Sequence, residues 1–188
     1  MAEVFLIRTG DRIQGIPLLC EAAGSRFTGK DVVVKANYNS ADPFPASTHP
    51  DTLISLLREI RGQNPHTVAL LERSGMGNTR RVLDQSGVYD NLVPLAVDIV
   101  VLDDLSAKEW THIPGEGMHW NNGFYVPDRL LRAGSVVSTC CLKTHRFGGH
   151  FTLSLKNSVG MVAKTVPDSN HNYMHELHSS PFQRLMIA

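Results

Sequence analysis

The five residues Asp31 to Lys35 (DVVVK) constrain the fold most, because they contain three consecutive valines. A strand exposed on one face alternates apolar and polar side chains, whereas an unbroken apolar run indicates burial on both faces. Such burial is typical of a parallel sheet with helices on either side. Further strands are predicted at Glu3 to Arg8, Thr67 to Glu72, Ala96 to Asp103 and Ser135 to Cys141.

Segments with helical periodicity or helix-start signals separate these strands. They are predicted at Arg12 to Ala23, at Pro50 to Arg61 with Thr48 or Asp51 as cap, after Arg80 to about Gln85, at Pro127 to Arg132, and from Asn170 or Asn172 onward. Strands that alternate with helices at this spacing form right-handed βαβ units. The sequence therefore predicts one α/β domain over residues 1–188, a Rossmann-like three-layer arrangement with a mainly parallel sheet flanked by helices.

Composition and charge narrow the possible partners. The 188 residues include 18 basic and 18 acidic side chains, so the chain lacks the basic excess of a nucleic-acid-binding protein. No apolar run reaches the length of a membrane-spanning helix, and no secretory signal precedes the first predicted strand, so we expect a cytoplasmic protein. Neither pattern specifies the oligomeric state. The apolar, uncapped end Leu185 to Ala188 leads us to expect a domain that is incomplete at its C-terminus.

Polar loops follow three of the predicted strands. They run from Lys35 to His49, from Arg73 to Arg80 and from Lys143 to Asn157. Because the carboxyl ends of parallel strands meet at one edge, where open α/β sheets bind ligands, we expect these loops to form one cleft. Cations gathered in one cleft of a neutral protein favour a small anionic molecule.

The second loop is a turn with two glycines, Gly75 and Gly77, that opens a helix. Free amide groups at such a turn can hold an anion, and Arg73 could add a guanidinium. The third glycine of a dinucleotide fingerprint and the lysine of a phosphate-binding loop are both missing. The turn is therefore either an anion cradle or a plain tight turn.

The stretch from Val136 to Gly160 carries the densest group of candidate site residues. We predict that Lys143 and His145 share acid–base work on a carboxylate- or phosphate-bearing metabolite, because histidine titrates near neutral pH and crowded lysines can lose their proton. The predicted anion-binding residues are Lys35, Asn37, His49, Arg73, Gly75, Gly77, Lys156 and Asn157.

A non-catalytic module that binds a metal or an anion is the alternative. His171, His175 and His178 share one face of the last predicted helix, and two histidines at this spacing can ligate a metal. They have no identifiable cysteine or carboxylate partner, so a polar or substrate-facing helix edge is the other interpretation. The adjacent Cys140 and Cys141 are typical of buried thiols. The sequence therefore assigns no metal site, and the cofactor stays unknown.

Three segments resemble the family called domain of unknown function 362: KANYNSADPFPASTHPDTL, ERSGMG and CLKTHRFGGHFTLSLKNSVG. The resemblance implies a role for Lys35, Asn37, Thr48, His49, Lys143, His145, Lys156 and Asn157. This chain departs from the pattern at Ala36, where proline is usual. Many relatives are longer and carry an iron–sulfur ferredoxin module, for which no cysteine cluster is found here, so an accessory role in iron–sulfur redox chemistry is a further alternative. The resemblance supplies candidate residues and no reaction.

Overall fold

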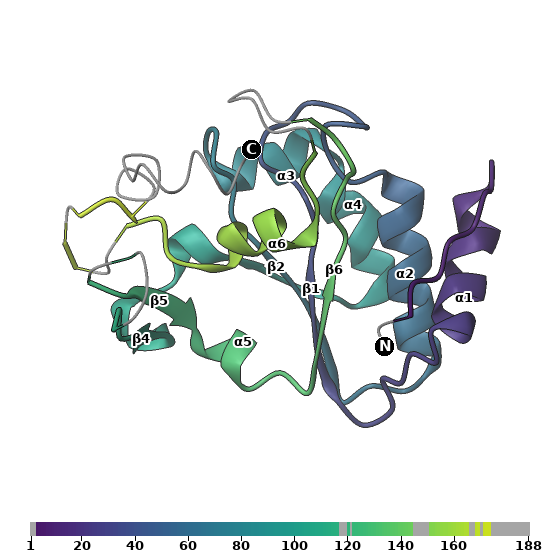
Figure 1. The fold of residues 1–188 in the computed structure, drawn as a ribbon, viewed down its shortest axis with the longest axis horizontal. Helices are drawn as coiled ribbons and strands as arrows, with labels where there is room; N and C mark the ends of the chain where they lie inside the picture. Colours follow the sequence, from purple (N-terminus) through teal and green to yellow (C-terminus); the bar gives the residue numbers. More distant parts are fainter. Residues whose placement is uncertain are drawn as a thin grey trace.

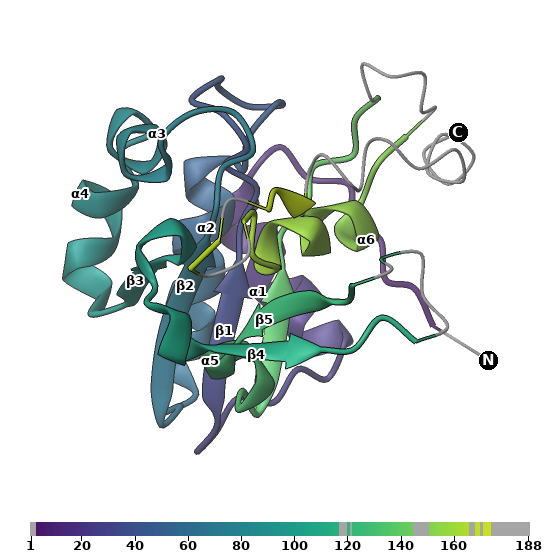
Figure 2. The ribbon, with the colours of Figure 1, turned by 90° about the vertical axis from the view of Figure 1, so that its left-hand side faces the viewer.

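The structure is a computed structural model that describes residues 3–116, 120, 122–144, 151–165, 168–169 and 171–173. Its centre is a four-stranded parallel sheet in the order β3-β2-β1-β6 (Figures 1 and 2). The strands are β1 (Asp31–Lys35), β2 (Thr67–Glu72), β3 (Asp98–Val101) and β6 (Ser135–Ser138). The predicted α/β class and the parallel sheet are both confirmed.

Helices cover one face of the sheet, and a mixed layer covers the other (Figures 1 and 2). The first layer holds α1 (Arg12–Ala22), α2 (Pro50–Gly62), α3 (Thr79–Gln85) and α4 (Val88–Leu92). The second holds α5 (Asp128–Leu131), α6 (Ser154–Asn157) and an antiparallel hairpin of β4 (Trp110–Ile113) and β5 (Phe124–Pro127). Short 3₁₀ turns occupy Val93–Leu95, Leu102–Asp104, Ala107–Glu109 and Ser158–Met161.

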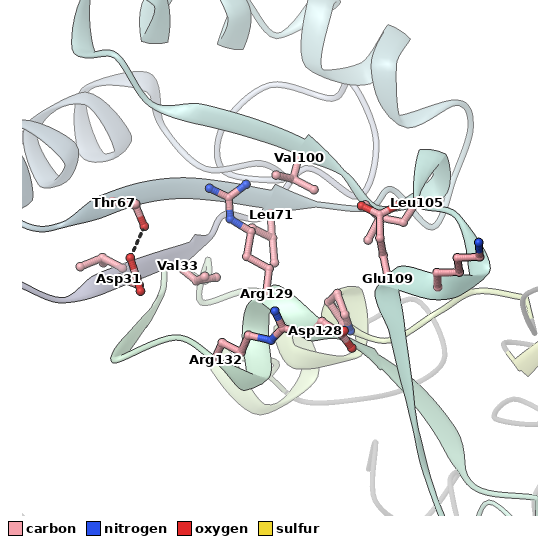
Figure 3. A pocket seen from close by; sticks show the side chains of 13 residues that line it. Asp31, Val33, Thr67, Leu71, Val100, Leu105, Glu109, Asp128, Arg129 and Arg132 are labelled. Carbon is pink, nitrogen blue, oxygen red and sulfur yellow. Dashed lines mark hydrogen bonds and ion pairs between the residues drawn. The ribbon is translucent and has the colours of Figure 1, made fainter.

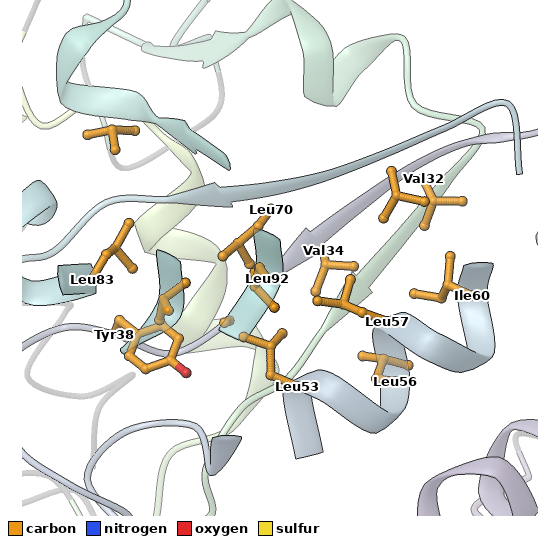
Figure 4. Packing of buried hydrophobic residues seen from close by; sticks show 14 of the residues in the cluster. Val32, Val34, Tyr38, Leu53, Leu56, Leu57, Ile60, Leu70, Leu83 and Leu92 are labelled. Carbon is orange, nitrogen blue, oxygen red and sulfur yellow. The ribbon is translucent and has the colours of Figure 1, made fainter. Parts of the chain in front are cut away.

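Alternate side chains of the central strands pack into two separate hydrophobic cores. Val32 and Val34 of β1 pack with Leu57 of α2 in the larger cluster, which Figure 4 shows. Val33, between them, faces the other way and packs with Leu71 in a smaller cluster under the second layer. Because successive side chains of a strand point to opposite faces, a run of valines fills both cores at once.

The strand order places the three polar loops together. β1 lies between β2 and β6, with Val34 opposite Leu70 on one side and Val137 on the other. The carboxyl ends of these three strands therefore lie side by side, and the loops that begin at Lys35, Arg73 and residue 139 leave the sheet at one edge. This juxtaposition is the one predicted from the alternation of strands and helices.

Three details of the prediction differ from the structure. Residues Glu3 to Arg8 form no strand, and Val4 and Leu6 are 90% and 96% exposed, because an apolar run forms a strand only where a neighbour accepts its hydrogen bonds. The cap of α2 is His49, not Thr48 or Asp51. Two strands are shorter than predicted: β3 ends at Val101, since Leu102 begins a 3₁₀ turn, and β6 ends at Ser138 and not at Cys141.

Two further expectations concern the ends of the chain and the membrane. The helix predicted from Asn170 or Asn172 lies almost entirely outside the described residues. In the part of the chain that is described, no helix is long and apolar enough to cross a bilayer.

Candidate functional site

A buried ion pair lies at the end of the two central strands. The ammonium of Lys35, the last residue of β1, donates to Oε1 of Glu72, the last residue of β2, and to the carbonyl of Ala36. The two side chains are only 2% and 0% exposed. Burial lowers the pKa of Lys35 and raises the pKa of Glu72, and in each case the partner's charge opposes the shift. Lys35 therefore contacts a carboxylate beneath the surface rather than solvent.

Asn157 ties α6 to the sheet directly above this pair. Its Nδ2 donates to the Lys35 carbonyl at 3.3 Å and to the Ser138 hydroxyl at 2.9 Å. These two residues are paired neighbours on β1 and β6. The Asn157 side chain thus bridges two strand ends and fixes the start of the turn that follows.

Arg73 holds the segment that follows α6. Its Nε donates to the Val162 carbonyl at 3.1 Å and its Nη2 to the Val159 carbonyl at 2.6 Å, and the residue is 4% exposed. Burial lowers the pKa of the guanidinium, and the charges of Asp103 and Glu72 oppose that shift. In these contacts Arg73 fastens backbone carbonyls over the sheet edge.

The loops after β1 and β6 are joined by side-chain contacts. The Thr48 hydroxyl accepts from the Asn37 amide at 2.9 Å and lies 3.2 Å from the Thr139 carbonyl, to which it donates. The carbonyl of Ala46 accepts from Asn37 Nδ2 at 3.4 Å and also from the Lys143 ammonium. Asn37 and Lys143, predicted from distant parts of the sequence, therefore share one acceptor.

Lys143 and Lys156 place two positive charges in the same region. Lys156 belongs to α6 and its side chain is exposed, while Lys143 is half-buried. Partial desolvation lowers the pKa of Lys156, and the charge of Lys143 lowers it further. Among the residues that the structure describes, no carboxylate pairs with either ammonium.

The glycine turn uses its amide groups internally. The Ser74 amide donates to the Thr79 hydroxyl at 2.8 Å, the Gly75 amide to Asn39 Oδ1 at 3.0 Å, and the Met76 amide to the Asn39 carbonyl at 3.0 Å. Gly77 has a φ of 106°, which favours glycine. These contacts support the interpretation as a tight turn, tied to the β1 loop through Asn39.

His49 acts as the helix cap of α2. Its Nδ1 accepts from the Asp51 amide at 3.1 Å, and its ring packs edge-on against Phe44 with the centroids 5.2 Å apart. The cap places His49 at the base of the β1 loop. A role in binding an anion stays a prediction for this residue.

Several predicted residues lie outside the described part of the chain. They are His145, the proposed partner of Lys143, and His175 and His178 of the last predicted helix. Within the described residues, no group of three or more histidine, cysteine or carboxylate side chains could hold a metal ion.

Sequence reasoning missed Glu72 as a partner of the site. A signal was present: the apolar runs DVVVK and TVALLE end in opposite charges, and neighbouring parallel strands bring such ends together. A charged residue that ends a strand buried on both faces needs a partner. Ser138 and Thr139, which contact Asn157 and Thr48, carried no such signal because small hydroxyl residues are common at strand ends.

A cavity of about 550 Å³ lies elsewhere, on the sheet face beside α5 (Figure 3). Apolar side chains such as Val33 and Leu71 form its floor. Charged residues rim it, and its arginines pair with acidic neighbours: Arg129 with Asp98, and Arg132 with Asp128. None of the predicted site residues lines this cavity, so the candidate site rests on the side chains at the sheet edge.

Comparison with known proteins identifies a family that this chain matches. The sequence profile of the family described as domain of unknown function 362 matches residues 32–188, which is most of the chain. No curated protein and no solved structure matches the chain. The match begins at Val32, the second residue of β1, and includes every predicted site residue.

Proposed function

The chain belongs to the domain of unknown function 362 family, and we propose that it binds a small carboxylate- or phosphate-bearing metabolite between Lys143 and Lys156. The supporting observation is that both lysines belong to segments at the sheet edge where ligands of open α/β proteins bind, and that partial burial and then the charge of Lys143 lower the pKa of Lys156. Two like charges without a carboxylate partner among the described residues favour an anion that fits between them.

Contacts with neighbouring segments fix the positions of Lys143 and Lys156. Lys143 is tethered to the Ala46 carbonyl of the β1 loop, and Lys156 is carried by α6, which Asn157 fastens to the ends of β1 and β6. An anion bound between them would relieve their repulsion and stabilise the protonated form of Lys156. Lys35 and Arg73 would act beneath the anion, as supports of the segment that carries Lys156.

Transformation of the bound molecule is the further step of this proposal. The acid–base roles predicted for Lys143 and His145 stay predictions, as does the cytoplasmic location.

Isothermal titration calorimetry with inorganic phosphate and with citrate tests the binding proposal. We expect Lys143→Ala and Lys156→Ala each to weaken binding of the better ligand about tenfold, the effect of removing one charge near a protein surface. Lys108→Ala is the matched control, because this exposed lysine lies on the 3₁₀ turn before β4 and lines the separate cavity beside α5. Equal affinities in all four proteins, or no binding to the wild type, would contradict the proposal.

A further inference from the structure

Gly160 packs closely against the lysine of the buried ion pair. A Cβ atom placed on Gly160 would lie 2.7 Å from Cε and 3.1 Å from Nζ of Lys35, and 3.6 Å from the Arg73 carbonyl. Gly160 is not among the glycines with a positive φ, so its backbone conformation suits any residue. The requirement for glycine here is therefore one of space.

Lys35 cannot easily move aside for such an atom. Its ammonium donates to Glu72 and to the Ala36 carbonyl, and the whole side chain is buried. Glu72 is fixed in turn, because its Oε1 also accepts from the Arg73 amide at 2.9 Å. A displaced ammonium would leave both charges buried without a partner, which is costly.

The backbone at Gly160 cannot easily move away from the ion pair either. Arg73 donates to the carbonyls of Val159 and Val162, which flank Gly160 on both sides. Asn157 fastens the preceding helical turn to the Lys35 carbonyl. Residues 157–162 are therefore held against the ion pair at three points.

We propose that Glu72 and Gly160 are positioning residues for the anion site. Glu72 fixes Lys35, and the backbone at Gly160 rests on Lys35, so α6 holds Lys156 at the sheet edge only while residue 160 has no side chain. This inference rests on the proposed function for its ligand, but the placement of Lys156 that it describes can be measured without one.

The first test compares Gly160→Ala with Gly62→Ala. A Cβ on Gly62 meets no atom within 4 Å, so that variant controls for the glycine-to-alanine change itself. We expect Gly160→Ala to weaken the binding of phosphate or citrate about tenfold. We also expect the pKa of Lys156, measured by competitive acetylation and mass spectrometry, to rise toward the ordinary lysine value as α6 lifts away from Lys143. Wild-type affinity in Gly160→Ala, or an unchanged Lys156 labelling curve, would overturn the proposal.

A rescue variant tests the contact directly. Lys35→Val/Glu72→Leu replaces the ion pair with apolar side chains and removes the atoms that a Cβ at position 160 would meet; such replacements are often tolerated. In this background we expect Gly160→Ala to leave the melting temperature and the Lys156 labelling curve unchanged. If Gly160→Ala lowers the melting temperature equally in the wild type and in Lys35→Val/Glu72→Leu, Lys35 is not the residue that excludes a side chain at position 160. If Gly160→Ala alone fails to fold, the triple variant Lys35→Val/Glu72→Leu/Gly160→Ala decides the question. A folded triple variant supports the proposal, and an unfolded one contradicts it.

These measurements separate this inference from the proposed function. If the wild type binds neither phosphate nor citrate, the anion site is wrong, while the labelling curves still decide whether Gly160 positions Lys156. If the wild type binds and Gly160→Ala binds equally well, the positioning role is wrong and the anion site stands.

Discussion

The Lys35 ammonium contacts the Glu72 carboxylate at the end of two neighbouring strands, although the residues are 37 positions apart in the sequence. Their pairing explains why two charged side chains can end strands that are otherwise apolar and buried on both faces. Lys35 and Glu72 lie beneath the segment that carries Lys156 and Asn157. The stability of this pair therefore bears on the geometry of the whole candidate site.

Removal of Glu72 should be strongly destabilising. Glu72→Ala leaves the Lys35 ammonium buried without its carboxylate, for which we expect a loss of about 3–5 kcal/mol in the free energy of unfolding. Urea denaturation measures this loss. Glu21→Ala, at an exposed glutamate of α1, should change the free energy of unfolding by less than about 0.5 kcal/mol. Similar stabilities for the two variants would be inconsistent with the buried pair.

Arg73 should be irreplaceable by lysine in spite of the equal charge. A lysine cannot reproduce both donations, from Nε to Val162 and from Nη2 to Val159. We expect Arg73→Lys to cost about 2 kcal/mol in the free energy of unfolding and to speed amide exchange in residues 157–163. Arg129→Lys, at an exposed pair with Asp98, serves as the control. Exchange in residues 157–163 as slow as in the wild type would show that Arg73 does not hold this segment.

Variants of His49 can distinguish its role as a helix cap from a role in binding the anion. His49→Ala removes the acceptor for the Asp51 amide and should cost about 1 kcal/mol in the free energy of unfolding. His49→Asn restores a good cap and should recover that stability. If His49→Asn regains stability but binds phosphate or citrate more weakly than the wild type, His49 also contacts the anion, as predicted from the sequence.

The anion affinity should depend on pH through Lys156. Its pKa lies below the ordinary lysine value, so its positive charge is lost at a lower pH, and affinity should fall as the pH rises through that lowered pKa. Lys143→Ala removes the smaller of the two causes, so the acetylation curve of Lys156 should move to higher pH without reaching the ordinary lysine curve. Lys108→Ala should leave the curve in place. A curve that Lys143→Ala does not move would show that the two ammonium groups are far apart.

The sheet was predictable because its strands are buried on both faces. Three consecutive valines in β1 require partners on both faces, and the neighbouring runs supply parallel strands at the right spacing. The same reasoning failed at Glu3 to Arg8, which has strand-like residues but forms no strand. Apolar composition indicates that a segment could form a strand. The strand forms only where the edge of a sheet offers free backbone groups for its hydrogen bonds.

The convergence of the polar loops at one sheet edge was predictable, and the direction of their side chains was not. Parallel strands had to bring the loops after Lys35, Glu72 and Ser138 to one edge, and they do. Residue type alone did not reveal that Lys35 and Arg73 turn inward to Glu72 and to backbone carbonyls. Those partners belong to other segments, and their distances depend on strand register and on the packing of residues 157–162.

A crystal structure grown with selenate tests the central claim most directly, since the selenium atom of this tetrahedral dianion gives an anomalous signal. We predict an anomalous peak between the ammonium groups of Lys143 and Lys156, present in two crystal forms and absent in Lys143→Ala/Lys156→Ala. A peak elsewhere on the protein, with these two side chains apart and no ion between them, would contradict the account.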